Sequence, residues 1–344
     1  MPTAARRGRK KTGPSIEDVA RLAGVSAQTV SRVSTGANPV RESTRARVLA
    51  AMDQLGYSPN RAARALRNGT FGTIGLVAHR FERTGEALIT AAVAEAAQAA
   101  GYAITLLGVR GPEATDWEHS AQRLTHQGVD GLIIIRAEQT APESLALPAG
   151  LPVVASDSRF VGYYPTVAAD QTQGTQDAVS HLLELGHRTI HHIAGPADAM
   201  ASQVRTGTWR RRLEEAGVRP PDLWRGDWTG GSGYRAGLQI AADPSITAVF
   251  CANDEMAFGL MRALYEAGRR VPEDVSVVGF DGIALSEFSA PALTTVRQDF
   301  GTVGRELVRL VIEQIRSAGV PPQVRLLVPT ELIVRSTTAP PPVR

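Results

Sequence analysis

The sequence predicts an all-α helix-turn-helix head followed by an α/β body of parallel sheets flanked by helices. Two observations predict this fold class. Short helical patterns separated by Gly and Ser fill the first 58 residues, whereas short apolar runs alternate with helical stretches from Thr73 onward. The roughly 270 residues of this second part exceed what one sheet usually holds, which favours a body of two lobes.

Composition excludes several classes of protein. Of the 344 residues 43% are hydrophobic and 21% charged, a balance that supports a buried core. A single cysteine, Cys251, excludes an internal disulfide framework and a cysteine-based zinc site, and no phosphate-binding glycine loop is present, so we expect no metal and no cofactor. No apolar run reaches ~18 residues and the N-terminus lacks the apolar stretch of a secretory signal, so we expect a cytoplasmic protein without a membrane segment.

The net charge of +3 is unevenly distributed along the chain. Residues 1–70 hold 13 Lys and Arg against four Asp and Glu, a net charge of +9. The other 274 residues hold 24 basic and 30 acidic side chains, a net charge of −6. A cationic head on an acidic body indicates that the head meets a polyanion such as nucleic acid, although a solvated basic terminus is the alternative.

The head begins with a flexible basic arm at residues 1–14, followed by a three-helix domain at residues 15–58. Ser15 and Asp18 form a capping pair for the first helix, and Ser26 caps a second helix in which Val30 and Val33 face inward. A third helix starts at residue 42 or 43 and ends at Gly56. The side chains expected to form the apolar stripes of the first and third helices are Ile16, Val19, Ala20, Leu22, Ala46, Val48, Leu49, Met52 and Leu55.

The outward face of the second helix carries side chains that suit the major groove of DNA. Gln28 can pair with adenine and Arg32 with guanine, while Ala27 offers only a methyl contact. The short hydroxyls of the segment suit phosphate oxygens. The candidate DNA contacts of this helix are Ser26, Ala27, Gln28, Thr29, Ser31 and Arg32. The alternative is a pair of helices with an ordinary polar surface.

Residues 16–33 (IEDVARLAGVSAQTVSRV) and 55–66 (LGYSPNRAARAL) closely resemble the N-terminal signature of the lactose/galactose-repressor (LacI/GalR) family of transcriptional regulators. The resemblance implies that residues 59–71 form a hinge helix and linker that order on operator DNA. It further implies that Asn60, Ala63 and Leu66 contact the minor groove, with Leu66 as a wedge between base pairs. The alternative is that Leu66 is an ordinary linker residue packed on the next domain.

In the body we expect strands at residues 73–78, 103–109, 131–135, 152–155, 189–194, 248–251 and 275–280. Between and after them we expect helices at residues 86–100, 116–127, 172–185, 205–216, 233–241, 254–267 and 302–316. Apolar runs that suit burial on both faces indicate parallel sheets covered by helices on both sides.

The body resembles the effector domain of the same family, which is similar to periplasmic sugar-binding proteins. Residues 252–257 (ANDEMA), 274–281 (DVSVVGFD) and 293–300 (LTTVRQDF) carry this resemblance most strongly. It implies an effector-binding and dimerisation domain at residues 72–338, with a tail at 339–344. The N-subdomain is then about 72–169 plus 300–327, and the C-subdomain about 171–297 plus 328–338.

Several polar residues follow directly after expected strands, where ligand sites of α/β sheets lie. Asn253, Asp281 and Asp157 each occupy such a position. The resemblance implies that Arg205, Asn253 and Asp281 form the polar core of an effector site, with Asp157 and Gln298 as further ligands. Trp228 and Phe300 are the aromatic candidates, and Trp209 is a weaker one. The alternatives are helix caps for Asn253 and Asp281 and a surface ion pair for Arg205. For Phe300 and Trp209 the alternative is a plain core position.

The resemblance implies a sequence-specific DNA-binding regulator, a repressor of carbohydrate uptake or catabolism genes that a mono- or disaccharide inducer releases from a pseudo-palindromic operator. A homodimer is expected, because a proline-rich segment occupies the place of the leucine-heptad helix of tetrameric relatives. The same architecture with a purine-type co-repressor is one alternative, and a sugar-binding transport or sensory protein without a DNA role is another. No catalytic motif indicates an enzyme.

Overall fold

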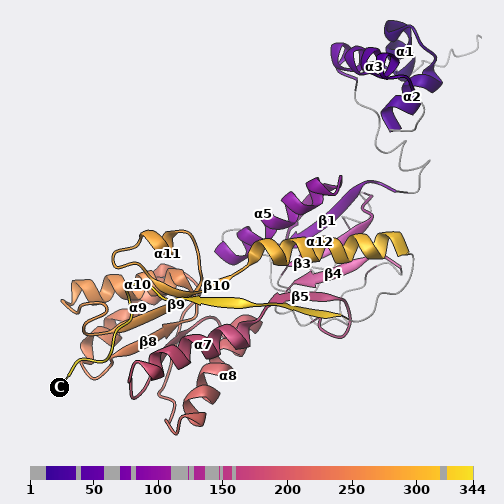
Figure 1. The fold of residues 1–344 in the computed structure, drawn as a ribbon. Coiled ribbons are helices and arrows are strands. Elements are labelled where there is room, and N and C mark those ends of the chain that lie inside the picture. Colours follow the sequence, from indigo (N-terminus) through magenta and orange to yellow (C-terminus); the bar gives the residue numbers. More distant parts are fainter. Residues whose placement is uncertain are drawn as a thin grey trace, which may run out of the picture. The chain divides into compact units, whose positions relative to one another are not determined.

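The computed structural model describes residues 13–35, 40–57, 70–78, 83–109, 123, 128–135, 147, 150–156, 160–317 and 324–343. The chain divides into two compact units, Met1–Phe71 and Gly72–Arg344. The first is a three-helix head, and the second is a body with two sheets (Figure 1). The predicted fold class is therefore confirmed.

The head contains α1 (Ile16–Ala23), α2 (Ala27–Thr35) and α3 (Glu42–Leu55). The predicted capping pair starts α1: the Ser15 Oγ accepts from the Asp18 N–H (3.3 Å), and the Asp18 carboxylate accepts from the Ser15 N–H (2.9 Å). Gly24 follows α1 with φ 65°, a left-handed conformation that favours glycine and turns the chain toward α2.

Small side chains form much of the head core, which differs in part from the predicted stripes. Leu22 (46% exposed), Leu49 (49% exposed) and Ala46 face solvent, whereas Ala23 and Ala51 are buried. The alanines let three short helices approach closely, which turns the larger leucines outward. The buried core residues are Val19, Ala20, Ala23, Val30, Val33, Val48, Ala51 and Met52.

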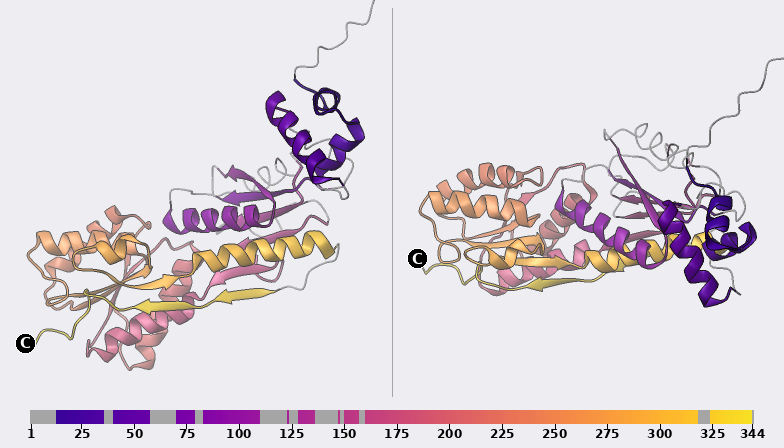
Figure 2. Two further views of the ribbon diagram at one scale, coloured as in Figure 1. Left: turned by 45° about the horizontal axis from the view of Figure 1, so that its top comes forward. Right: turned by 90° about the horizontal axis from the view of Figure 1, so that it is seen from above.

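The first lobe of the body is built on a parallel sheet with strand order β11-β5-β4-β3-β1-β2. Helices α5 (Thr84–Ala99) and α12 (Phe300–Ser317) lie side by side against it (Figures 1 and 2). They approach closely at Gly304, where an added Cβ would lie 2.5 Å from the Ala92 Cβ. The strands are β1 (Thr73–Ala78), β2 (Ala103–Gly108), β3 (Gly131–Ile135), β4 (Val153–Ser156), β5 (Thr166–Ala169) and β11 (Arg325–Val328).

The second lobe has the strand order β12-β10-β9-β8-β6-β7. Its strands are β6 (His191–Ala194), β7 (Trp224–Arg225), β8 (Ala248–Cys251), β9 (Ser276–Asp281), β10 (Thr294–Gln298) and β12 (Thr330–Ile333). Its helices are α7 (Gln171–Glu184), α8 (Met200–Glu215), α9 (Gly230–Ala242), α10 (Asp254–Glu266) and α11 (Leu285–Phe288). Strand β12 pairs antiparallel with β10, so this sheet is mixed rather than wholly parallel as predicted. An antiparallel edge strand on an otherwise parallel sheet is a common arrangement.

The chain passes between the lobes three times, each time through one residue. Asp170 joins β5 to α7, Asp299 joins β10 to α12, and Pro329 joins β11 to β12. The two aspartates also cap the helices they precede, since their carboxylates accept from the N–H groups of Gln173 (2.9 Å) and Thr302 (2.8 Å). These three links are the crossovers between the lobes.

All seven predicted strands are present, with shifts of one or two residues at several ends. Strands β5, β7, β10, β11 and β12 were not predicted, because each is short or lacks a continuous apolar run. Helix α8 begins at Met200, five residues before the prediction, since the intervening residues contain neither Gly nor Pro. The helix expected at residues 116–127 lies outside the described residues apart from residue 123.

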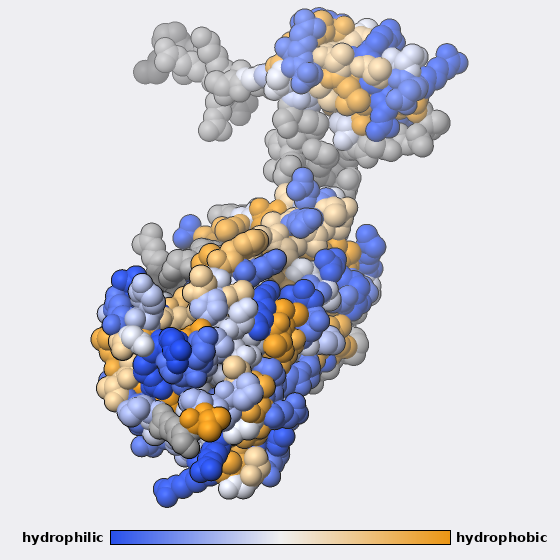
Figure 3. All heavy atoms as spheres, turned by 60° about the vertical axis from the view of Figure 1, so that its left-hand side comes forward, coloured by the Kyte–Doolittle hydropathy of each residue, from blue (hydrophilic) through white to orange (hydrophobic). Residues whose placement is uncertain are grey.

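On the face of the body drawn in Figure 3, hydrophobic residues lie in small groups among hydrophilic ones. Within the described part of the chain, no helix combines the length and the apolar character needed to cross a membrane.

Candidate ligand-binding cleft

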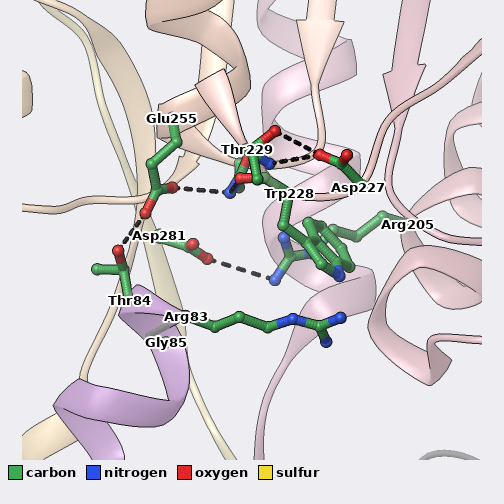
Figure 4. A pocket seen from close by; sticks show the side chains of 10 residues that line it. Arg83, Thr84, Gly85, Arg205, Asp227, Trp228, Thr229, Glu255 and Asp281 are labelled. Carbon is green, nitrogen blue, oxygen red and sulfur yellow. Dashed lines mark hydrogen bonds and ion pairs between the residues drawn. The ribbon is translucent and has the colours of Figure 1, made fainter. Parts of the chain in front are cut away.

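A cavity of about 310 Å³ lies between the two lobes of the body (Figure 4). One side comes from the start of α5 in the first lobe, and the other comes from the carboxyl ends of strands in the second lobe. This is the position in which open α/β sheets bind ligands. The lining residues are Arg83, Thr84, Gly85, Arg205, Asp227, Trp228, Thr229, Asn253, Glu255 and Asp281.

Arg205 is 1% exposed and is held from several sides. Its Nε donates to Gln171 Oε1 (2.8 Å), and its guanidinium also donates to the Ala252 carbonyl and lies 3.5 Å from Asp281 Oδ1. The same group stacks 3.7 Å from the centre of the Phe280 ring. Arg205 lies in the second turn of α8, rather than at its start as predicted, and these contacts fix its orientation beside the cavity.

Four buried side chains form a closed ring beneath the cavity, which we call the polar ring: Arg205, Gln171, Gln298 and Asp281. Gln171 accepts from Arg205 and donates to Gln298 Oε1 (3.1 Å). Gln298 in turn donates to Asp281 Oδ1 (2.5 Å), and Asp281 pairs with Arg205. Gln298 therefore supports Asp281 from behind and does not line the cavity, in contrast to its predicted role as a ligand.

Asn253 lines the cavity and also caps a helix, as the alternative interpretation predicted. Its Oδ1 accepts from the Met256 N–H (3.0 Å) at the start of α10. Its Nδ2 donates to the Trp228 carbonyl (2.9 Å) and to Glu255 Oε2 (2.7 Å). The side chain is consequently fixed by contacts with two other residues of the cleft.

Two cleft residues have backbone conformations that are unusual for non-glycine residues. Trp228 has φ 74° and Asp281 has φ 112°. Such conformations cost about 1–3 kcal/mol each and cluster at binding sites. The Trp228 ring lies directly on Gly195, where an added Cβ would come within 2.4 Å of it, so only glycine leaves room for the ring.

Asp254 is buried next to the cleft and anchors the segment that follows Asp281. Its carboxylate accepts from the Thr295 hydroxyl (2.5 Å), the Ser286 hydroxyl (2.7 Å) and the Ile283 N–H (2.9 Å). Burial, together with the negative charge of Asp281, raises the pKa of Asp254 to about 7. These three contacts hold Asp281 and the chain beyond it in place against α10.

Among the described residues, Phe300 and Trp209 do not line this cavity. Phe300 starts α12, packs against the core of the first lobe and borders a different hollow that Gln298 also lines. Trp209 is fully buried and donates to the Ile190 carbonyl (2.9 Å), as a core residue does. Asp157 lies outside the described residues, as do Asn60, Ala63 and Leu66 of the hinge.

Six lining residues were missed by the sequence analysis. Asp227 and Thr229 flank Trp228, and Glu255 follows Asn253 by two positions, so proximity to predicted residues was the available signal. Arg83, Thr84 and Gly85 come from the other lobe, and no motif marks them. Within the described residues, no group of three or more His, Cys, Asp or Glu side chains is placed to hold a metal ion.

In the head, Gln28 and Arg32 are exposed on α2, and Ser31 is half-buried. The Ser26 Oγ accepts from the Thr29 N–H (3.2 Å) and lies 2.9 Å from the Thr29 hydroxyl, so Ser26 caps the helix as predicted. Ala27 is half-buried against the head core instead of facing outward, because the Cβ of the first helical residue tilts toward the preceding turn.

Two family models match the chain. Residues 15–60 match bacterial regulatory proteins of the lacI family, and residues 179–338 match a periplasmic binding protein-like domain. The chain is 35% identical to the HTH-type transcriptional regulator CelR of Thermobifida fusca, covering 95% of this chain and 99% of that protein. It is 33% identical to the lactose operon repressor of Escherichia coli, and this match covers 95% of this chain and 91% of that repressor.

Solved structures agree with these matches. The lac repressor dimer bound to operator and the anti-inducer ONPF has a TM-score of 0.84 at 32% identity, covering 95% of this chain and 100% of that one. The complex of CelR with cellobiose has a TM-score of 0.68 at 34% identity, and this match covers 94% of this chain and 99% of that one. The head and the two-lobed body thus define a DNA-binding transcriptional regulator and not an enzyme. The chain belongs to the lacI family of bacterial regulatory proteins.

Proposed function

We propose that this regulator represses carbohydrate genes in the cytoplasm and that a small sugar binding in the cleft releases it from its operator. The observation that carries the proposal is the fixed Arg205–Asp281 pair of the polar ring, with Trp228 beside it between the lobes. Cellobiose is bound by a relative that is 34% identical to this chain.

The chemistry of the cleft suits a ligand with many hydroxyls and an apolar ring face. Asp281 supplies carboxylate acceptors for hydroxyls, and the amide oxygen of Asn253 supplies a further one. Arg205 supplies donors in a fixed plane, and Trp228 supplies a flat apolar wall. We assign direct contact with the sugar to these four residues and include Asp157, which lies outside the described part of the chain, as a further ligand. Gln298 positions Asp281 from behind.

For the head we propose that α2 enters the major groove, with Gln28 and Arg32 on base edges and Ser26, Thr29 and Ser31 near phosphates. The hinge at residues 59–71 then reads the minor groove through Asn60, Ala63 and Leu66. Residues 15–58 serve as the DNA-binding domain, and residues 72–338 bind the effector and form the dimer.

A homodimer gives two heads for the two halves of a pseudo-palindromic operator. The second lobe exposes two large apolar side chains on α11, Leu285 (57% exposed) and Phe288 (77% exposed). Leu88 of α5 and Ile283 line one hollow, so apolar side chains of both lobes gather on one face. We propose that this face is part of the dimer interface.

The experiment that tests the function is a thermal-shift screen with cellobiose, lactose, ribose, adenine, guanine and hypoxanthine. A ligand present at 100 times its dissociation constant stabilises a protein by about 2.7 kcal/mol, which such a screen detects. The hit is then added to a complex of the protein with a duplex selected from random DNA. A sugar that stabilises the protein and releases this duplex supports the proposal.

Asp281→Ala provides the control within the site. The variant is expected to bind the selected duplex with unchanged affinity and to lose the response to the sugar. A variant that still responds normally would remove Asp281 from the site, and binding of none of the sugars would argue against a sugar effector.

The second candidate is a purine that acts as a co-repressor. The chain is 33% identical to the HTH-type transcriptional repressor PurR of Haemophilus influenzae, covering 94% of this chain and 98% of that protein. The Trp228 ring also suits stacking on a purine. The two candidates differ in sign, because a co-repressor tightens DNA binding and an inducer weakens it.

A further inference from the structure

One side-chain hydrogen bond spans the cleft from lobe to lobe. The Thr84 hydroxyl donates to Glu255 Oε1, and Figure 4 shows both side chains at the cavity. Thr84 is the first residue of α5 in the first lobe, and Glu255 is the second residue of α10 in the second lobe. The bond therefore joins a helix of the first lobe to a helix of the second lobe.

Glu255 also contacts the part of the site that receives the ligand. Its second oxygen accepts from Asn253 Nδ2 (2.7 Å), and the same nitrogen donates to the Trp228 carbonyl (2.9 Å). A chain of hydrogen bonds thus runs from α5 through Glu255 and Asn253 to the backbone of Trp228. The chain links Thr84 in one lobe to two residues of the other lobe that line the cavity.

The partners of Glu255 distinguish it from the other two carboxylates that line the cavity. Asp281 pairs with Arg205 (3.5 Å) and Asp227 pairs with Arg235 (3.7 Å). Among the described residues, the hydrogen-bond donors to Glu255 are a neutral hydroxyl and a neutral amide. A hydrogen bond to an ionised carboxylate is stronger than one between neutral groups, so the Thr84 contact is a strong one for its size.

We infer that Thr84 and Glu255 form a latch that holds the two lobes together over the cleft, and that Glu255 is a positioning residue that passes this closure on to Asn253. The inference goes beyond the proposed function, because the latch acts on the lobes with or without a ligand. Losing it shifts the balance between closed and open lobes about tenfold toward the open form.

Three variants isolate the latch. Thr84→Val removes the hydroxyl at nearly constant shape, Thr84→Ser restores a donor, and Glu255→Ala removes the acceptor. Thr90→Val is the matched control on the same helix, because the buried Thr90 hydroxyl makes no hydrogen bond within the described residues. A merely structural effect of Thr-to-Val replacement in α5 would appear in both Val variants.

The deciding measurement is the distance between the lobes of the ligand-free full-length protein, by spin labels at Glu95→Cys and Glu214→Cys. Both positions are exposed, one on α5 and one on α8, while the native Cys251 is buried and is expected to escape labelling. We expect Thr84→Val and Glu255→Ala to add a population at longer distance, and Thr84→Ser and Thr90→Val to match the parent. Identical distributions for Thr84→Val and the parent would overturn the latch.

A second measurement uses cellobiose as the probe. If cellobiose binds, Thr84→Val is expected to raise its dissociation rate about tenfold, and Thr84→Ser to restore it. If cellobiose fails to bind, that result counts against the sugar proposal, whereas the latch is judged by the spin-label distances alone. The two ideas therefore fail separately.

Discussion

At the scale of single residues, the second lobe joins four of its buried polar side chains in the polar ring. In the polar ring each member has a partner on both sides, and Gln171 joins Arg205 to Gln298. Gln171 and Gln298 also flank the crossovers at Asp170 and Asp299. The ring therefore connects the ligand-facing ion pair to the links between the lobes.

Gln171→Met tests this connection. Methionine has a similar length but neither accepts from Arg205 nor donates to Gln298, so two buried groups lose a partner. We expect a loss of about 1–3 kcal/mol in the free energy of unfolding and a weaker ligand response. Urea unfolding and the DNA-release assay measure the two effects.

Gln203→Met is the control for that variant. Gln203 lies on the exposed side of α8, and its side chain donates to the Ala197 carbonyl at the surface (2.8 Å). A change within about 0.5 kcal/mol is expected there. Equal losses for both variants would show that the polar ring has no special importance.

His192 predicts a pH dependence of stability. It is fully buried, and its Nδ1–H donates to the Phe250 carbonyl (2.9 Å). Its ring stacks on the Phe250 ring, with the two ring centres 4.9 Å apart. Burial lowers the pKa of His192 to about 3. Between pH 6.5 and 3 the unfolded chain binds a proton at this residue and the folded chain does not, so acid favours unfolding by about 1.4 kcal/mol per pH unit from this residue.

His192→Asn keeps a donor near the Phe250 carbonyl and removes the titrating ring. Its unfolding free energy should fall less steeply with acid than that of the parent over this range, with the two curves nearly parallel above pH 7. Urea unfolding at a series of pH values checks this. Parallel curves throughout the acid range would mean that His192 takes up its proton in the folded state.

At the scale of elements, α9 and α10 cross in close contact at glycines. A Cβ on Gly233 would lie 2.1 Å from the Met256 carbonyl oxygen, and one on Gly259 would lie 2.0 Å from the Gly230 carbonyl oxygen. The crossing brings the start of α10, with Asn253 and Glu255, against the turn that carries Trp228. Close packing of these helices thus sets the geometry of one cleft wall.

Gly233→Ala and Gly259→Ala should each destabilise the body by about 1–3 kcal/mol, because the added methyl meets backbone atoms that cannot move aside. Gly207→Ala is the matched control within a helix. No heavy atom lies within 4 Å of a Cβ at Gly207, so alanine there should stabilise by up to about 1 kcal/mol. Thermal unfolding measures all three, and a loss at Gly207 equal to the others would refute the packing argument.

A strand or helix was predictable where its own residues form a recognisable apolar pattern. Apolar runs such as β1, β3 and β8 were placed with their observed bounds. Strands β11 and β12 were not, since they are four residues long, are separated by Pro329 alone and belong to different sheets. Local sequence patterns do not tell which lobe a short strand joins, because single-residue crossovers such as Asp170 and Asp299 resemble ordinary helix caps. The expected boundaries of the two subdomains came from the family resemblance alone.

The same limit applies to the cleft. The rule that ligand sites follow strand ends identified Asn253 and Asp281. Thr84 and Gly85 follow no such rule, because they enter the cavity only when the second lobe is placed opposite α5. The wall of the cavity that the first lobe supplies therefore depends on an arrangement that local sequence patterns do not contain.

At the scale of the whole molecule, the charge of the chain separates two binding activities. Residues 1–70 carry +9 and the remainder −6. Operator affinity should fall by about three orders of magnitude between 50 and 200 mM salt, because phosphate contacts release counterions. Sugar affinity should hardly change, since hydroxyl contacts release none. Titrations at several salt concentrations check both, and equal slopes would contradict this division.

The proposed dimer face provides the last prediction. Phe288→Ser should shift the protein toward monomer in sedimentation at micromolar concentration, because it removes a large exposed apolar side chain from that face. Tyr163→Ser is the control, since Tyr163 is 54% exposed in the first lobe. A dimer as stable as the parent in Phe288→Ser would exclude α11 from the interface.

The three single-residue crossovers restrict how the body can move. The first two are tied by the bond between Gln171 and Gln298 (3.1 Å), and Gln173 accepts from the Thr330 N–H (3.0 Å) beside the third. Links this short leave few free torsion angles, and the ring of Pro329 fixes one of them. The lobes can rotate about the row of links but cannot slide past one another. Opening is therefore close to motion along a single coordinate, with small displacements at the links and the largest ones at the ends of the lobes.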